Sequence, residues 1–239
     1  MFDDTARLFD RYYYSRPNYS GGTTQFHALC SGLIGAKSDI LEIGAGPSNR
    51  TSDHISGLGH LIGVDVSEEL KGNRALVGGC VYDGARLPFA DDSFDACVSN
   101  YVLEHVEDPT AHFKEVRRVL RPQGVYIFRT PNLLHYVALI SRLLPHAAHR
   151  LLANKLRGMS NDSHDPWPTV YRSNTRHAIH RLASLASLRL EVCRLIEPEP
   201  SYGSASRLLF FPMMFYERLV NSTERLMSIR ANILGAMRK

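Results

Sequence analysis

Short apolar runs alternate with stretches of helical periodicity over residues 39–130. The apolar runs predict strands at 40–43, 61–64, 80–82, 94–99 and 125–129. Between the last two runs, 109–120 is the clearest helix, because Phe113, Val116 and Val119 recur at helical spacing. Strands that alternate with helices are typical of a parallel sheet, so we expect an α/β fold with a doubly wound sheet.

The pattern changes beyond residue 131 to a long segment rich in Leu, His and Arg. It predicts a helix at 133–144, a polar loop at 159–169, a helix at 174–185, a sixth strand at 188–196, and a helical C-terminus from Ser206 with Leu226, Ile229, Ile233 and Met237 on one face. We expect a single domain, 1–239, made of an N-terminal cap (1–36), a core (37–131), a lid or acceptor insertion (132–187), and a sixth strand with a helical C-terminal region (188–239).

The composition is that of an ordinary globular protein, with 44% hydrophobic and 22% charged residues. The four cysteines are scattered, with no Cys-x-x-Cys pair, which disfavours a disulfide scaffold or a zinc finger and favours the reducing cytoplasm. The N-terminus is acidic where a signal peptide is basic, and no apolar run approaches the roughly 20 residues that a bilayer requires.

Charge is distributed unevenly along the chain. Residues 1–130 carry 13 Lys or Arg against 17 Asp or Glu, whereas residues 131–239 carry 15 against 7. A solvated surface explains the basic half as well as an anionic substrate or a membrane surface does. Because the basic residues are dispersed and no binding module for RNA or DNA accompanies them, we expect no nucleic-acid partner.

A glycine turn, Gly44-Ala45-Gly46, follows the first predicted strand. This is the nucleotide-binding position of an open parallel sheet, because glycine permits a tight turn and lets a ligand approach bare backbone. The third glycine of the dinucleotide fingerprint is replaced by Asn49, and Pro47 removes an amide donor that a pyrophosphate would use. The turn therefore favours an adenosyl cofactor that lacks phosphate.

Two carboxylates follow the next two predicted strands. Asp65 ends the second strand, where a carboxylate accepts hydrogen bonds from ribose hydroxyls, and Asp83 ends the third, where it can accept from an adenine amino group. A single aspartate at a strand end is more often a helix cap or a turn former. The pair in this order, after the glycine turn, instead indicates a nucleoside site.

The ordered motifs resemble those of class I S-adenosylmethionine-dependent methyltransferases, in particular the group that modifies small molecules, lipids and glycans. The resemblance covers residues 39–132 and rests on LEIGAG, GVD, DGARLPF, DDSFDACVSNYVLEHV and EVRRVLRPQGVYIFRTPN, in that order. Ser48 stands for the common third turn glycine, and Gln123 interrupts the frequent Pro-Gly-Gly before the fifth strand. The resemblance implies a Rossmann-like fold and S-adenosylmethionine as cofactor.

The resemblance also implies which residues hold each part of the cofactor. The methionine end would face Glu42 and the backbone of Gly44, Ala45 and Gly46; the ribose would lie at Asp65 and Val66; adenine would lie at Asp83, Gly84 and Ala85; and Asn100 and Tyr101 would close over the sulfonium.

Candidates for the acceptor side are fewer. His105 is a candidate general base, although it also fits a structural role in the loop after the fourth strand. His135 and His164 of the expected lid, with Tyr13 and Tyr171, are candidates to line an acceptor pocket; aromatic residues are more often core packing.

No metal is expected at this site. Some quinone O-methyltransferases bind a divalent metal through a Glu-x-x-Glu-His cluster, but Tyr101 stands here in place of the first acid.

We therefore expect methyl transfer by in-line displacement, with oxygen as the methylated atom and a small-molecule, glycan or lipid-linked acceptor. The basic C-terminal half and the apolar run 208–216 suggest peripheral contact with a membrane. Two alternatives stay open: an NAD-dependent oxidoreductase, and a non-catalytic subunit that holds the cofactor. The oligomeric state is not legible in the sequence.

Overall fold

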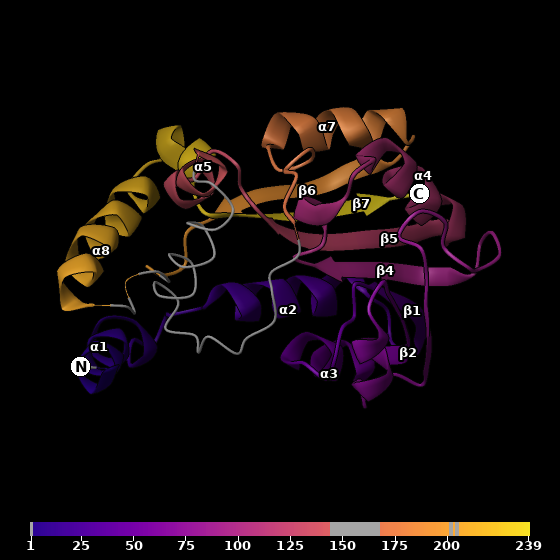
Figure 1. The fold of residues 1–239 in the computed structure, drawn as a ribbon, viewed down its shortest axis with the longest axis horizontal. Helices are drawn as coiled ribbons and strands as arrows, with labels where there is room; N and C mark the ends of the chain where they lie inside the picture. The colour runs from indigo at the N-terminus through magenta and orange to yellow at the C-terminus, as the bar shows by residue number, and fades with distance from the viewer. Residues whose placement is uncertain (1, 144–167, 201–202, 204–205) are drawn as a thin grey trace. The chain divides into compact units, whose positions relative to one another are not determined.

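The structure is a computed structural model that describes residues 2–143, 168–200, 203 and 206–239. Its centre is a seven-stranded sheet in the order β3-β2-β1-β4-β5-β7-β6 (Figure 1). The strands are β1 (Ser38–Ile43), β2 (Gly59–Asp65), β3 (Gly78–Val81), β4 (Phe94–Asn100), β5 (Leu120–Pro131), β6 (Arg189–Ile196) and β7 (Asn232–Arg238). The first five strands pair in parallel, and β7 runs antiparallel to β5, which confirms the predicted doubly wound α/β fold.

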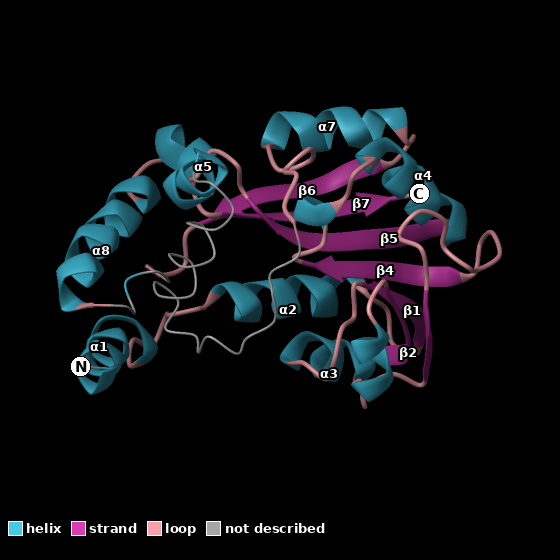
Figure 2. Ribbon diagram, viewed as in Figure 1, coloured by secondary structure: helices cyan, strands magenta, loops and turns pink. Residues whose placement is uncertain are grey.

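The helices of the described chain are α1 (Phe2–Phe9), α2 (Gly22–Leu33), α3 (Arg50–Ser56), α4 (Pro109–Val119), α5 (Tyr136–Leu143), α7 (Arg176–Leu185) and α8 (Arg207–Asn221), with short helical turns at Asp10–Tyr14, Glu68–Gly72, Leu103–His105 and Glu224–Ile229. Figure 2 shows α4 and α7 on one face of the sheet and α2 and α3 on the other. Strands covered on both faces read as continuous apolar runs, which is why Ile40, Leu41 and Ile43 of β1 are all fully buried.

The chain divides into two compact units. The sheet unit comprises Thr23–Pro131, Thr169–Arg194 and Asn232–Lys239, and the helical unit comprises Met1–Gly22, Asn132–Pro168 and Leu195–Ala231. These bounds cut across the cap, core, lid and C-terminal segments expected from the sequence, and the single-domain division stays a prediction.

The C-terminus corrects one expectation. Residues 232–238 form β7 rather than a continuing helix, so Ile233 and Met237 do not share a helical face with Leu226 and Ile229, which lie in the turn Glu224–Ile229. Both faces of β7 are buried, and a strand of this kind shows no alternation that separates it from an apolar helix. Gly235 lets β7 approach β5, since a Cβ there would lie 2.1 Å from the Phe128 ring.

The other predicted elements differ from the structure mainly at their ends. The helix expected at 133–144 begins at Tyr136, and the one expected at 174–185 begins at Arg176, after Thr175 caps it. The polar loop at 159–169 lies outside the described residues up to 167. None of the helices that the structure describes is long and apolar enough to cross a membrane.

Candidate cofactor site

The glycine turn leaves bare backbone at the carboxyl end of β1. Gly44 and Gly46 have positive φ angles of 71° and 54°, which residues with a Cβ adopt only at a cost. A Cβ on Gly44 would lie 2.3 Å from Cγ2 of Val102, whereas a Cβ on Gly46 would meet nothing within 4 Å. Gly44 is thus required by packing against the protein, and Gly46 faces open space that a ligand can occupy.

Two asparagines hold this turn from behind. The side-chain oxygen of Asn49 caps α3 by accepting the N–H groups of Thr51 (2.9 Å) and Ser52 (3.0 Å), while its amide donates to the carbonyl of Ala45 (2.8 Å). The Asn73 amide donates to the same carbonyl at 3.2 Å and to Oγ of Ser52 at 3.0 Å. From the sequence, Asn49 was interpreted only as a missing glycine, and no pattern marks Asn73, so the structure alone reveals these positioning roles.

Glu42 is a buried carboxyl group beside the turn, with 2% of its surface exposed. Ser52 hydrogen-bonds to this carboxyl group, but within the described structure Oε2 has no hydrogen-bond partner. Burial, together with the negative charges of Asp53 and Asp65, raises the pKa of Glu42 to about 7. A buried carboxyl oxygen with unused hydrogen-bonding capacity is suited to accept from an ammonium group.

Asp65 connects the glycine turn to the end of β2. Its Oδ2 accepts the N–H of Gly46 at 2.9 Å, and its Oδ1 accepts the N–H of Ser67 at 2.8 Å. Each carboxylate oxygen has a second lone pair, so these backbone bonds leave capacity for ligand hydroxyls. Asp65 is therefore both a turn-fixing residue and a candidate ligand residue.

Asp83 lies at the same edge of the sheet. Its Oδ1 accepts the N–H groups of Ala85 (2.8 Å) and Arg86 (3.1 Å), and these bonds lower its pKa. Tyr82 lies close to both Asp65 and Asp83. Burial, and then the negative charges of these two aspartates, raise the pKa of Tyr82 to about 12.

Val66 and Gly84 lie next to each other between these two carboxylates. Val66 is 43% exposed, and a Cβ on Gly84 would lie 3.3 Å from Cγ1 of Val66. The structure thus brings the residues predicted for ribose and adenine together at one edge.

Asn100 and Tyr101 at the end of β4 are engaged within the protein. Asn100 accepts from Nε of Arg129 at 2.7 Å and donates to Oγ1 of Thr51 at 3.0 Å, which joins β5, β4 and α3. Tyr101 has a φ of 60°, its ring lies 4.5 Å below the Arg129 guanidinium, and its hydroxyl donates to Asn232 at 3.0 Å. Their contact with a sulfonium stays a prediction. Arg129, which is 5% exposed, supports both residues and carries no signal in the sequence that marks this role.

The loop after β4 is tied to the segment before α7. The N–H of His105 donates to the Val102 carbonyl at 2.9 Å, and the carbonyl of Glu104 accepts the N–H of Tyr171 at 3.2 Å. The Glu104 carboxylate is buried and accepts the Thr130 hydroxyl at 3.0 Å. His105 and Tyr171 therefore lie on adjacent segments of the sheet unit, and within the described part of the chain no three His, Cys, Asp or Glu side chains gather to hold a metal.

Two further candidates, His135 and Tyr13, belong to the helical unit. Nε2 of His135 lies 3.5 Å from Oε2 of Glu197; burial lowers the pKa of His135 to about 4 and raises that of Glu197 to about 8. Tyr13 is 2% exposed and donates to Glu217 at 2.9 Å. Both side chains lie in the interior of their unit, so contact with an acceptor stays a prediction, and His164 lies outside the described residues.

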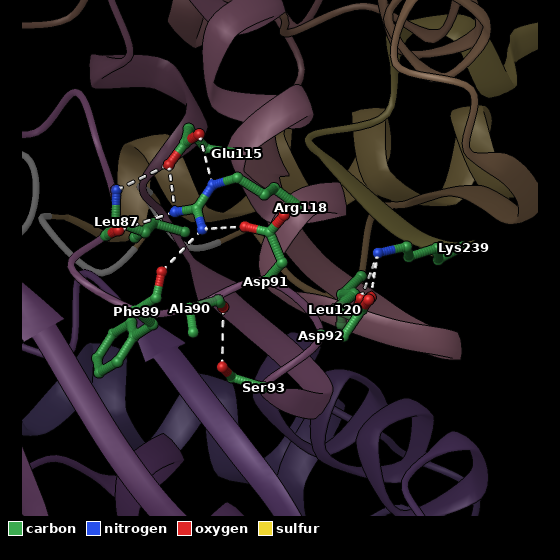
Figure 3. A network of polar contacts seen from close by, with 10 residues as sticks. All are labelled: Leu87, Phe89, Ala90, Asp91, Asp92, Ser93, Glu115, Arg118, Leu120 and Lys239. Atoms are coloured by element: carbon green, nitrogen blue, oxygen red, sulfur yellow. Dashed lines mark hydrogen bonds and ion pairs between the residues drawn. The ribbon is translucent and has the colours of Figure 1, made fainter.

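Arg118 on α4 fixes the loop that follows β3 (Figure 3). Its guanidinium donates to the carbonyls of Leu87 (2.9 Å) and Phe89 (2.8 Å) and pairs with Glu115 and Asp91, each at 2.8 Å. Glu115 is three residues away on the same helix, but the partners of Arg118 in the loop lie 27 to 31 residues away, so nothing in the local sequence marks this role. It holds the segment that begins at the predicted adenine position.

Comparison with known proteins agrees with this geometry. The family described as "Methyltransferase domain" matches residues 41–128. The chain is 34% identical over 124 residues to a demethylmenaquinone methyltransferase of Corynebacterium glutamicum, covering 48% of this chain and 54% of the relative. It is 31% identical over 159 residues to the protein of that name from Mycobacterium sp. (strain JLS), covering 63% of this chain and 68% of the relative.

A solved structure shows the same fold over nearly the whole chain. The S-adenosylmethionine-dependent methyltransferase of Mesorhizobium loti has a TM-score of 0.59 and 18% identity, and the match covers 92% of this chain and 99% of that one.

The residues present also fit the cofactor of these proteins. The Glu42 oxygen that has no partner among the described residues suits an ammonium, the bare backbone at Gly46 admits a close ligand, and the carboxylates of Asp65 and Asp83 suit a nucleoside. The chain belongs to the class I S-adenosylmethionine-dependent methyltransferases, with S-adenosylmethionine as its cofactor.

Proposed function

We propose that this chain transfers a methyl group from S-adenosylmethionine to an oxygen of a small-molecule acceptor of the reduced-quinone class that carries a lipid tail. The observation that carries methyl transfer is the cluster at the carboxyl edge of the sheet, where Glu42, Gly46, Asp65 and Asp83 lie on three neighbouring strand ends. The relatives named for demethylmenaquinone favour a quinone over a glycan.

In this proposal each residue of the site positions one part of the cofactor. Glu42 accepts from the methionine ammonium, the remaining lone pairs of Asp65 accept from the ribose hydroxyls, and Asp83 with the backbone of Gly84 and Ala85 holds adenine. When bound, the cofactor supplies an electrophilic methyl group on its sulfonium. Asn100 and Tyr101, already fixed by Arg129, form the wall beside that methyl group.

The protein's contribution to rate is mainly alignment of the acceptor with the methyl group. A phenolic hydroxyl is a weak nucleophile until it loses its proton, and we assign proton removal to His105. General-base catalysis of this kind contributes about 10²–10⁴-fold. We place the reaction in the cytoplasm, with the chain at the membrane surface when the acceptor carries a lipid tail.

The test uses the full chain with labelled S-adenosylmethionine and three acceptors: a reduced quinone with an isoprenoid tail, its short water-soluble analogue, and an oligosaccharide. We expect label in both quinol products, with the methyl group on oxygen by NMR, and none in the oligosaccharide. Label only in the oligosaccharide, or a methyl group on ring carbon, would contradict the acceptor assignment. Tight cofactor binding without any transfer would support the non-catalytic alternative.

His105→Gln separates the base from a structural part of the loop. If His105 removes the proton, turnover falls by about 10²–10⁴-fold while the affinity for the cofactor and the melting temperature stay unchanged. Parallel losses of turnover and melting temperature would show that His105 only shapes its loop.

A further inference from the structure

One side of α8 exposes large apolar side chains to solvent. The exposed fractions are 87% for Leu208, 42% for Phe211, 69% for Phe215 and 46% for Leu219. These positions recur three or four residues apart, so they form one stripe along the helix, which we call the α8 stripe. Figure 1 shows α8 as the helix near the C-terminal end of the chain, coloured yellow-orange.

The core of the helical unit uses mainly another side of α8; of the stripe residues, Phe211 contacts the Tyr12 ring, with ring centroids 6.2 Å apart. The opposite side of α8 already packs inward through Phe210, which is fully buried against Phe9 and Tyr13. The helix therefore has two apolar sides, one that forms the core and one that faces outward. A contiguous apolar patch on a protein surface is often a binding site.

The charges of α8 are segregated in the same way. Arg207 and Arg218 are exposed on α8 itself. Arg218 also pairs with Glu217 at 3.3 Å and lies over the Tyr13 ring. Just after the helix, exposed Arg225 is adjacent in sequence to exposed Glu224. The acidic residue of α8, Glu217, is instead 4% exposed and accepts hydrogen bonds from Tyr13 and Asn221. Within α8 the exposed charges are therefore arginines, and its one carboxylate is buried.

We propose that the α8 stripe binds the surface of a membrane that contains anionic lipids. An apolar face flanked by arginines is the composition of helices that lie in the interface plane of a bilayer. A second copy of the chain is a poorer occupant, since the stripe exposes on the order of 500 Å², below the roughly 800 Å² per partner of a stable interface.

This inference rests on the proposed function for its purpose, because an acceptor with a lipid tail is found in the membrane. Its geometry is independent of that function, since the stripe lies in the helical unit and the cofactor residues lie in the sheet unit. Binding to lipid and methyl transfer can therefore be measured separately.

The experiment is flotation of the full chain with vesicles of phosphatidylcholine, alone or mixed with phosphatidylglycerol. The stripe variant is Leu208→Ser with Phe215→Ser, and the charge variant is Arg207→Gln with Arg225→Gln. The matched control is Val77→Ser with Leu185→Ser, which removes two apolar side chains that are 71% and 51% exposed in the sheet unit.

We expect the wild type and the control to bind the mixed vesicles. The stripe variant should partition at least about tenfold less, because two large apolar side chains no longer enter the interface. The charge variant should lose preference for phosphatidylglycerol by about fivefold per arginine. Circular dichroism and affinity for S-adenosylmethionine should stay unchanged in all variants.

Three results would contradict lipid binding by the α8 stripe. They are no vesicle binding by the wild type, equal binding by the wild type and the stripe variant, or light scattering that shows a wild-type dimer and a monomeric stripe variant. If the variants change vesicle binding as expected but no quinol is methylated, the result would support lipid binding by the α8 stripe and contradict the proposed acceptor. If the chain methylates the water-soluble quinol but does not bind vesicles, the result would support the proposed acceptor and contradict lipid binding by the α8 stripe.

Discussion

Glu42→Gln probes the electrostatics of the cofactor site without changing its shape. The carboxyl group is 2% exposed, and burial with the nearby charges of Asp53 and Asp65 raises its pKa from 4.5 to about 7. A difference of that size means that ionising Glu42 in the folded chain costs roughly 3 kcal/mol more than in the unfolded chain. The folded state is therefore favoured while Glu42 keeps its proton.

The direction of the pH dependence follows from this raised pKa. The contribution of Glu42 to stability is fully present below about pH 4.5 and is lost as the pH rises through about 7. Glutamine is neutral throughout and keeps an oxygen for Ser52. The free energy of unfolding of Glu42→Gln minus that of the wild type should therefore rise by roughly 3 kcal/mol between about pH 4.5 and pH 8.

Urea unfolding followed by far-ultraviolet circular dichroism measures this difference across the pH range. Glu42→Gln should also weaken S-adenosylmethionine binding, because the ammonium loses a charged acceptor; a charged hydrogen bond contributes about 1.5–3 kcal/mol. Asp65→Asn in the wild-type background should move the stability transition to lower pH, since one of the charges that raise the Glu42 pKa is removed. Stability curves of wild type and Glu42→Gln that stay parallel at every pH would refute the reasoning.

Three further substitutions test the parts around the turn. Gly44→Ala should lower the free energy of unfolding by about 2–4 kcal/mol, because the added Cβ meets Val102 and φ is positive. Gly46→Ala should lower it by only about 1 kcal/mol and should act mainly on cofactor affinity. Equal effects of the two substitutions on unfolding and on calorimetric affinity would contradict these different roles. Asn49→Ala should cost about 1–2 kcal/mol in urea unfolding through loss of the α3 cap, and an unchanged midpoint would argue against it. Arg118→Met should weaken cofactor binding in calorimetry by about 1–2 kcal/mol by releasing the loop after β3, with unaltered affinity as the contrary result.

The sequence predicted the part of the fold in which local pattern and topology agree. Strands β1 and β4 and the Val125–Thr130 part of β5 are apolar runs because both faces of the sheet are covered there, and parallel strands bring their carboxyl ends to one edge. For that reason Glu42, Gly46, Asp65 and Asp83 could be placed together before any coordinates were known. Their order along the chain is also their order along the sheet.

What the sequence could not predict depends on contacts between distant residues. Asn73 supports the glycine turn from 27 positions away, and Arg129 on β5 donates to Asn100 on the adjacent strand β4, 29 positions away. Strand β7 was predicted as helix because the buried run at Ile233–Met237 has no alternation, and only its pairing with β5 makes it a strand. The interior positions of His135 and Tyr13 likewise follow from packing within the helical unit.

Calorimetric titration of the full chain with S-adenosylmethionine, beside NAD, tests the central claim most directly. We predict saturable one-to-one binding of S-adenosylmethionine, weakened by about 1.5–3 kcal/mol in Asp65→Ala because two ribose hydroxyls lose a charged acceptor. Asp39→Asn, at the opposite end of β1 and paired with Arg121, should bind as the wild type does. Binding of NAD in place of S-adenosylmethionine, or an unchanged dissociation constant in Asp65→Ala, would contradict the account.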